Sequence, residues 1–154
     1  MIVILHNVLY TLLYVIVYFA DVFQIYIGDF FGVKIERLLL GNNSIHELNF
    51  LSFWGLEYSL ETLDLSYNNF RRVPFEALRL LRNLRSLSLT GNRISKLEHY
   101  DFGFMRKLEV LAVDHNPIIA IDRYAFVGTQ LFLLILDHIR LRDRLAVFPL
   151  NDLM

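Results

Sequence analysis

Two acid–histidine pairs stand at equivalent places in the C-terminal half of this chain. They are Asp114-His115 and Asp137-His138, which lie 23 residues apart. Carboxylate and imidazole groups are ligands of divalent metals, and an imidazole changes its charge near neutral pH. If the fold brings the two pairs together, they form a metal site or a pH-sensitive cluster. The alternative is that both pairs are ordinary solvent-facing residues, and because we favour it we expect no bound metal and no other cofactor.

Other signatures of catalysis are missing from the sequence. With 0 cysteines, the chain has no cysteine nucleophile, no thiolate metal site and no disulfide framework. The 7 glycines are not gathered into a phosphate-binding loop, and neither an HExxH motif nor a Ser-His-Asp order is present. We therefore expect no catalytic residues, no enzymatic activity and no small-molecule substrate.

The composition narrows the classes of partner. Fifteen Lys and Arg residues oppose 16 Asp and Glu residues, which gives a net charge of -1. The strongly basic field that steers proteins to nucleic acid is absent, so we expect no nucleic-acid partner. Hydrophobic residues make up 55% of the chain and charged residues 20%. This composition predicts a packed core together with a membrane-contacting segment.

Two local surface motifs each have a functional and a plain interpretation. The sequence Asn42-Asn43-Ser44 is a glycosylation acceptor only if the chain enters the secretory pathway, and we favour a chance match at Asn42. A group of arginines forms either a patch for an acidic partner or a solvated convex face, and we favour the second. The group consists of Arg71, Arg72, Arg79, Arg82 and Arg85.

The sequence contains a tandem repeat, and its copies are the elements that must position these residues. Four segments fit the pattern LxxLxLxxNxI, and their first positions are separated by 25, 24 and 24 residues. They begin at Ile35, Leu60, Leu84 and Leu108. Two further apolar residues follow each segment at constant spacing, namely Leu48, Val73, Leu97 and Ile121, and then Phe53, Leu78, Phe102 and Phe126. A fifth copy begins at Leu131 but has Ile139 where the asparagine should stand, so the array decays there.

This pattern resembles the leucine-rich repeat family, in its typical class of about 24 residues per repeat, over residues 35–141. Copies such as Leu60-Glu-Thr-Leu-Asp-Leu-Ser-Tyr-Asn are similar to those of chaoptin-like and Toll-like extracellular proteins. The resemblance implies an α/β solenoid of four to five coils, preceded by an N-terminal apolar segment. A curved parallel sheet would line its concave side, and short helices or turns its convex side. Extracellular members usually carry cysteine-rich caps, which here lie outside the sequence unless the chain belongs to a cap-poor or intracellular branch.

The residues themselves explain why such a repeat folds. The fourth and sixth positions, such as Leu63 and Leu65, alternate with polar residues, which predicts a strand with one buried face. The conserved spacing of Asn43, Asn68, Asn92 and Asn116 places an amide where the chain leaves each strand, and we expect it to satisfy backbone groups of the turn. Aromatic rings should fill the convex side, and residues 75–82 suggest a short helical turn.

The outward strand positions form the expected recognition surface. We expect another protein to bind there, across three well-formed coils, through Glu61, Asp64, Tyr67, Arg85, Ser88, Glu109 and His115. Tyr67 is the best single anchor, unless it merely covers the turn beside Asn68. The last outward positions turn apolar and form either a contact patch for a partner or an interface to further repeats or a cap. They are Val110, Ala112, Phe132, Leu133 and Ile135.

The sequence divides into three parts. Residues 1–30 are an apolar signal peptide or membrane segment, residues 31–141 the repeat array, and residues 142–154 an irregular tail. Residues 1–20 contain no Asp, Glu, Lys or Arg, and their length is enough to reach across a bilayer core. A cleaved signal peptide, an uncleaved membrane anchor and a buried, strand-like piece of the core all stay open, so membrane association through residues 1–20 is an expectation.

These observations predict a protein–protein recognition module of a secreted or membrane-tethered leucine-rich repeat receptor or adhesion protein, located at the membrane or outside the cell. The alternative is an intracellular, cytoplasmic adaptor or scaffold built from the same repeats, which the missing cysteines favour.

Overall fold

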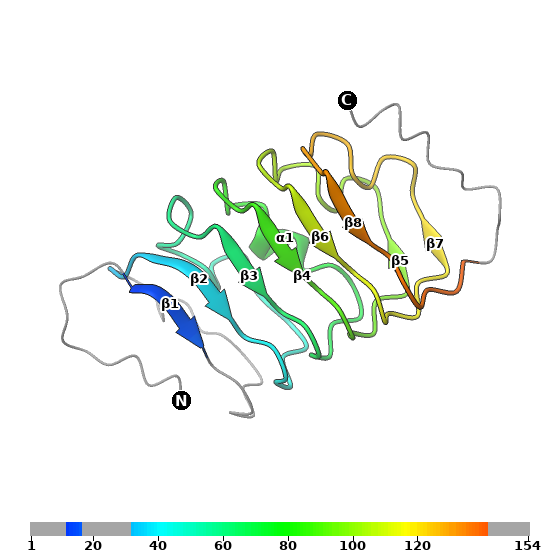
Figure 1. Ribbon diagram of the computed structural model, residues 1–154, viewed down its shortest axis with the longest axis horizontal. Helices are drawn as coiled ribbons and strands as arrows, with labels where there is room; N and C mark the ends of the chain where they lie inside the picture. The colour runs from blue at the N-terminus through cyan, green and yellow to red at the C-terminus, as the bar shows by residue number, and fades with distance from the viewer. Residues whose placement is uncertain (1–11, 17–31, 142–154) are drawn as a thin grey trace.

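The computed structural model shows a solenoid whose coils stack in a single direction (Figure 1). The structure describes residues 12–16 and 32–141. Six parallel strands lie side by side in one sheet, in the order β1-β2-β3-β4-β6-β8, and the connecting segments run behind them. Every coil contributes one strand, which confirms the expected architecture. The predicted tail over residues 142–154 lies outside the described residues.

The strands are short and are spaced by whole repeats. The main sheet contains β1 (Leu12–Ile16), β2 (Ile35–Leu39), β3 (Thr62–Asp64), β4 (Ser86–Ser88), β6 (Val110–Ala112) and β8 (Leu133–Ile135). A second, two-stranded parallel sheet pairs β5 (Lys96–Leu97) with β7 (Ala120–Ile121) on the far side of the coils. The register of the main sheet matches equivalent repeat positions, since Leu63 pairs with Leu87 and Leu87 with Leu111.

The alternation along each strand sorts side chains as the sequence predicts. Leu38, Leu63, Leu87 and Leu111 are at most 1% exposed, whereas the residues on either side of each are half-buried or exposed. Adjacent coils cover one another's inward leucines, so no coil could bury them alone. The last coil is less well covered, because Leu134 and Leu136 are only partly buried in the described structure.

Aromatic rings fill the convex side of the core. Phe53, Phe102 and Phe126 are at most 4% exposed, and the rings of Phe102 and Phe126 stack with centroids 5.6 Å apart. The expected helical turn is α1 (Phe75–Leu78), which is shorter than residues 75–82. The helix ends early because the Leu81 N–H donates to the Leu78 carbonyl at 3.0 Å, which is the tighter bond of a 3₁₀ turn.

The asparagines form a ladder that joins each coil to the coil before it. The Asn68 amide nitrogen donates to Leu65 O at 3.1 Å in its own coil and to Leu40 O at 2.9 Å in the preceding coil. Its oxygen accepts from the Ile45 N–H at 3.0 Å. Asn92 and Asn116 repeat the same three bonds. A single amide per repeat thus satisfies backbone groups that no strand could reach.

The N-terminal segment contributes one strand to the described structure. β1 pairs in parallel with β2, with Leu12 opposite Ile35 and Val15 opposite Leu38. The rest of residues 1–30 lies outside the described residues apart from this strand, so its assignment as a signal peptide or membrane segment stays a prediction. Among the described residues, no helix is long and apolar enough to cross a bilayer.

The ladder predicts a large difference between two adjacent asparagines. Asn68→Ala removes both the donor and the acceptor of a buried amide. It leaves Ile45 N unpaired and leaves Leu40 O with the Asn43 amide alone, so we expect it to lower the free energy of unfolding by about 2 kcal/mol. Asn69→Ala makes the same chemical change one residue later, at a half-buried side chain outside the ladder, and should cost less than about 1 kcal/mol. Urea denaturation followed by circular dichroism measures both, and equal losses would contradict the proposed role of the ladder.

Candidate functional site

The expected recognition residues lie along the outward face of the sheet and at its edge. Asp64 ends β3 and Ser88 ends β4, and both are half-buried. Glu61 and Arg85 come just before these strands and are exposed. The Arg85 guanidinium forms an ion pair with Glu109, one coil further along. The structure thus gathers these side chains on one face, and their role in binding stays a prediction.

A connected polar network crosses the late part of this face. The Ser88 hydroxyl lies 3.2 Å from the Thr90 hydroxyl, which donates to Asp114 Oδ1 at 2.6 Å. The other carboxylate oxygen of Asp114 lies 2.7 Å from His115 Nδ1, and the His115 ring stacks on His138 with centroids 4.1 Å apart. Burial alone would raise the pKa of Asp114, but the hydrogen bonds of Thr90 and His115 outweigh it and hold that pKa below its usual range.

The acid–histidine pairs therefore meet, but not as a set of metal ligands. His115 and His138 present ring faces to each other, and Asp137 joins them through its backbone carbonyl, which accepts from the His115 N–H at 3.0 Å. Among the residues that the structure describes, no group of three or more acidic or histidine side chains is placed to hold a metal ion. The contact between the two pairs follows from their equal repeat positions.

One position of the repeat has the same unusual backbone conformation in successive coils. The residue before each ladder asparagine, and its equivalent in the last coil, lies in the left-handed region, with φ between 51° and 67°. These residues are Asn42, Tyr67, Gly91, His115 and His138. A tyrosine or histidine pays for this conformation with steric strain.

Tyr67 is both a cover for the turn and an exposed ring. A Cβ atom added to Gly91 would lie 2.5 Å from Tyr67 Cδ1, so the ring lies directly over the glycine of the next coil. The tyrosine is nevertheless 51% exposed. The ring therefore packs against the next coil and is still half-exposed. The role of Tyr67 as an anchor for a partner stays a prediction.

The apolar end of the face is exposed as expected. Phe132 is 75% exposed and Leu133 is 44% exposed, while Val110, Ala112 and Ile135 are half-buried. An apolar surface of this kind fits a partner patch or the contact with a further coil or cap equally well.

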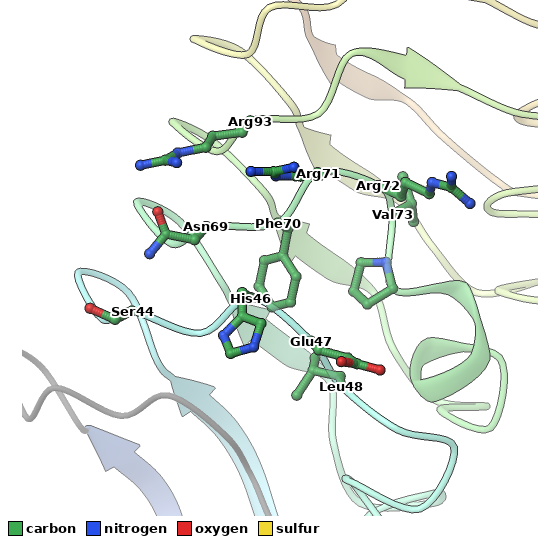
Figure 2. A pocket seen from close by; sticks show the side chains of 11 residues that line it. Ser44, His46, Glu47, Leu48, Asn69, Phe70, Arg71, Arg72, Val73 and Arg93 are labelled. Carbon is green, nitrogen blue, oxygen red and sulfur yellow. The ribbon is translucent and has the colours of Figure 1, made fainter.

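Two hollows lie away from the sheet face, and the sequence analysis predicted neither. The larger, with a volume of about 700 Å³, opens on the flank where the chain leaves the asparagine ladder (Figure 2). Arg71, Arg72 and Arg93 line it from two neighbouring coils, together with His46 from the coil before. This places Arg71 and Arg72 apart from Arg79 and Arg85, which pair with Glu76 and Glu109. The fold therefore divides the arginines that the sequence groups together. Reading the repeat columns beyond the asparagine would have revealed the flank.

The family follows from the repeat itself. A family model described as "Leucine rich repeat" matches residues 33–94 and 82–141. The chain belongs to the leucine-rich repeat family. This leucine-rich repeat chain is 37% identical to mouse podocan over 114 residues. The match covers 72% of the chain and 18% of podocan. It is 35% identical to chaoptin of Tribolium castaneum over 111 residues. That match covers 70% of the chain and 14% of chaoptin.

A solved structure shows the same fold. The crystal structure of a TLR13–ssRNA13 complex superposes with a TM-score of 0.63 at 31% sequence identity, over 68% of this chain and 15% of that one. The leucine-rich repeat chain thus spans less than a fifth of the length of each of these relatives. Leucine-rich repeat arrays form extended concave surfaces, and such arrays are in general protein-interaction modules.

Asp101 is a further residue that the sequence analysis missed. It occupies the smaller hollow and stands where the other coils have small buried residues, Ser52, Ala77 and Ala125. Its carboxylate accepts from the Glu98 N–H at 2.6 Å. Burial is the main cause that raises the pKa of Asp101 to about 6, and the nearby carboxylates of Glu98 and Asp122 add to it. The register of the repeat was the available signal, because it places a carboxylate in a column of small residues.

From the raised pKa of Asp101 we predict that removing its carboxylate stabilises the protein in a pH-dependent way. Because the pKa of Asp101 is raised, the folded protein keeps a proton that the unfolded chain loses. The ionised carboxylate therefore destabilises the fold most above pH 6, and this cost vanishes below about pH 4. Asp101→Asn keeps the acceptor for Glu98 N–H, and we expect it to raise the free energy of unfolding by about 1 kcal/mol at pH 8 and by nothing at pH 4. Denaturation at the two pH values measures the difference. Asp122→Asn is the control: the pKa of Asp122 is lowered, mainly by a hydrogen bond from the Tyr124 N–H, so this variant should show no gain.

Proposed function

We propose that the array is the protein-recognition part of a secreted or membrane-tethered receptor or adhesion protein, and that it binds another protein through its concave face. The observation that carries the proposal is the row of exposed and half-buried side chains on one face of a continuous sheet, from Glu61 on the second repeat to His115 on the fourth. A rigid sheet presents such side chains at little cost in conformational entropy.

The charges of this face favour a protein over a nucleic acid. Its outward positions hold six carboxylates against two guanidinium groups. The carboxylates are Glu36, Glu61, Asp64, Glu109, Asp114 and Asp137, and the arginines are Arg37 and Arg85. A phosphate backbone would be repelled here, because binding it requires neutralisation by Lys and Arg. Although the TLR13 structure is a complex with ssRNA13, the chemistry of this face suits a partner surface with basic and aromatic groups.

Chaoptin and podocan support the extracellular part of the proposal by their similarity alone. An intracellular adaptor built from the same repeats is the second candidate, and the absence of cysteine favours it. The two candidates differ in where the array is delivered, which depends on residues 1–20.

A reporter experiment separates these candidates. We expect a glycosylation-dependent or periplasm-type activity reporter fused after Asp29 to be delivered into the secretory lumen, because the preceding segment is apolar and carries no charge over its first 20 residues. Fractionation and protease protection measure the location. A matched fusion that begins after residue 20 should stay in the cytosol, and a full fusion that stays there as well would contradict the extracellular proposal.

Substitutions on the concave face test the binding proposal. A multimerised, labelled array is titrated on cells that bind it, and we expect Tyr67→Ala or Asp64→Ala to weaken binding at least about tenfold, because a half-exposed ring held by Gly91 is a suitable anchor. For Tyr67→Ala the free energy of unfolding should change by no more than about 0.5 kcal/mol.

Tyr58→Ala provides the matched control for Tyr67→Ala. Tyr58 is 72% exposed and lies in the segment between β2 and β3, away from the sheet. Its replacement should leave binding unchanged. If Tyr67→Ala and Asp64→Ala both leave the affinity unchanged, the concave face of these coils is not the binding surface.

A further inference from the structure

The flank pocket of Figure 2 combines arginine side chains with neutral polar groups. Its volume is about 700 Å³, and its lining comes from three successive coils. The coils are held in register along this flank, because the Asn69 N–H donates to Ile45 O at 2.8 Å and the Arg93 N–H donates to Phe70 O at 2.9 Å. The side chains around the pocket are therefore mounted on a hydrogen-bonded scaffold and not on a free loop.

Three guanidinium groups surround this pocket. Arg71, Arg72 and Arg93 are all exposed, and none makes an ion pair with a carboxylate of the described residues. Arg72 points away from the other two, so the charges stand on different sides of the opening (Figure 2). The single carboxylate in the lining is Glu47. An anion that enters here would meet forked donors from more than one direction.

Neutral polar groups and one accessible apolar residue complete the lining. Ser44, His46 and Asn69 offer a hydroxyl, an imidazole and an amide at one end of the pocket. Pro74 is half-buried, whereas Phe70 is 1% exposed. A sugar ring needs this mixture, because its hydroxyls bind polar groups while its C–H faces pack on apolar side chains.

We propose that this flank pocket binds the sulfate and carboxylate groups of a sulfated glycosaminoglycan chain. A linear polymer of acidic sugars would place successive anionic groups at Arg71 and Arg93 and a ring face beside Pro74. The choice of this polyanion rests on the proposed extracellular location, where such polymers occur. It is independent of the concave face, which lies on the other side of the ladder.

The same lining argues against two other polyanions. Single-stranded nucleic acid is bound by stacking of bases on exposed aromatic rings, and no large exposed aromatic residue of the described chain lines the pocket, since Phe70 is 1% exposed. An anionic membrane needs protruding apolar groups that enter the lipid, and the exposed apolar residues of the described chain likewise lie elsewhere.

Titration of the purified full chain with a heparin-derived octasaccharide, followed by isothermal calorimetry, tests the proposal. We expect saturable binding to the wild-type chain and none for the same octasaccharide after chemical desulfation. The double variant Arg71→Gln/Arg93→Gln should weaken binding at least about tenfold, since each lost contact is a hydrogen bond between charged groups. Glu47→Gln should strengthen binding, because it removes the one opposing charge of the lining.

The control is a double variant with the same change in net charge elsewhere. Arg82 and Arg106 are exposed and lie outside the pocket, so Arg82→Gln/Arg106→Gln should keep the affinity within about twofold. Tyr67→Ala should also keep it, which separates this site from the concave face.

Three outcomes would overturn the proposal. One is the absence of binding to the sulfated octasaccharide. Another is an equal loss in the two double variants, which would mean that only net charge matters. The third is a single-stranded oligonucleotide that displaces the octasaccharide from wild-type chain with higher affinity and loses that affinity in Arg71→Gln/Arg93→Gln, which would assign the pocket to nucleic acid.

Discussion

The structure depends on one buried amide in each of three successive coils, at Asn68, Asn92 and Asn116. A solenoid turn leaves its strand through backbone groups that have no partner in the sheet, and an unpaired buried group costs on the order of 1–3 kcal/mol. Asn92 satisfies the turn of its own coil, the carbonyl of Leu65 in the coil before, and the N–H of Phe70. Because the same bonds recur at each repeat, the spacing and register of all other columns follow from this ladder. The concave face and the flank pocket are both consequences of it.

The residue before each ladder asparagine shows what this geometry costs. Its left-handed backbone suits glycine, as at Gly91, but two described coils place a histidine there and one a tyrosine. Strained backbone of this kind persists where the surrounding structure holds it and is often linked to function. Here the asparagine ladder holds the strained backbone in place, because the next residue, Asn68 or Asn116, is hydrogen-bonded to the preceding coil. At this position the ring of Tyr67 packs over Gly91 of the next coil.

The sequence predicted those features that repeat and missed those that do not. The inward leucines, the ladder asparagines and the convex phenylalanines all lie where the spacing places them. The stacked rings of His115 and His138 could be predicted as neighbours, but their face-to-face geometry depends on the left-handed backbone, which no residue type other than glycine or asparagine signals. The strand β1 could not be separated from a membrane segment, because a continuous apolar run has no period to read. Asp101 and the flank arginines lie in columns where the residue type changes from coil to coil, so no repeated residue marks them in the sequence.

Net charge conceals how this chain distributes its charges. A value of -1 excludes a strongly basic protein as a whole, yet the repeat sorts charges by column, so that carboxylates collect on the sheet face while arginines surround the flank pocket. Screening at physiological salt reduces interactions between exposed charges beyond about 8 Å, so each face acts on a ligand largely through its own residues. The ladder asparagines Asn68, Asn92 and Asn116 stand between these faces in the chain. In a repeat of this kind, the electrostatic character of a binding surface is therefore a property of one column of the sequence and not of its composition.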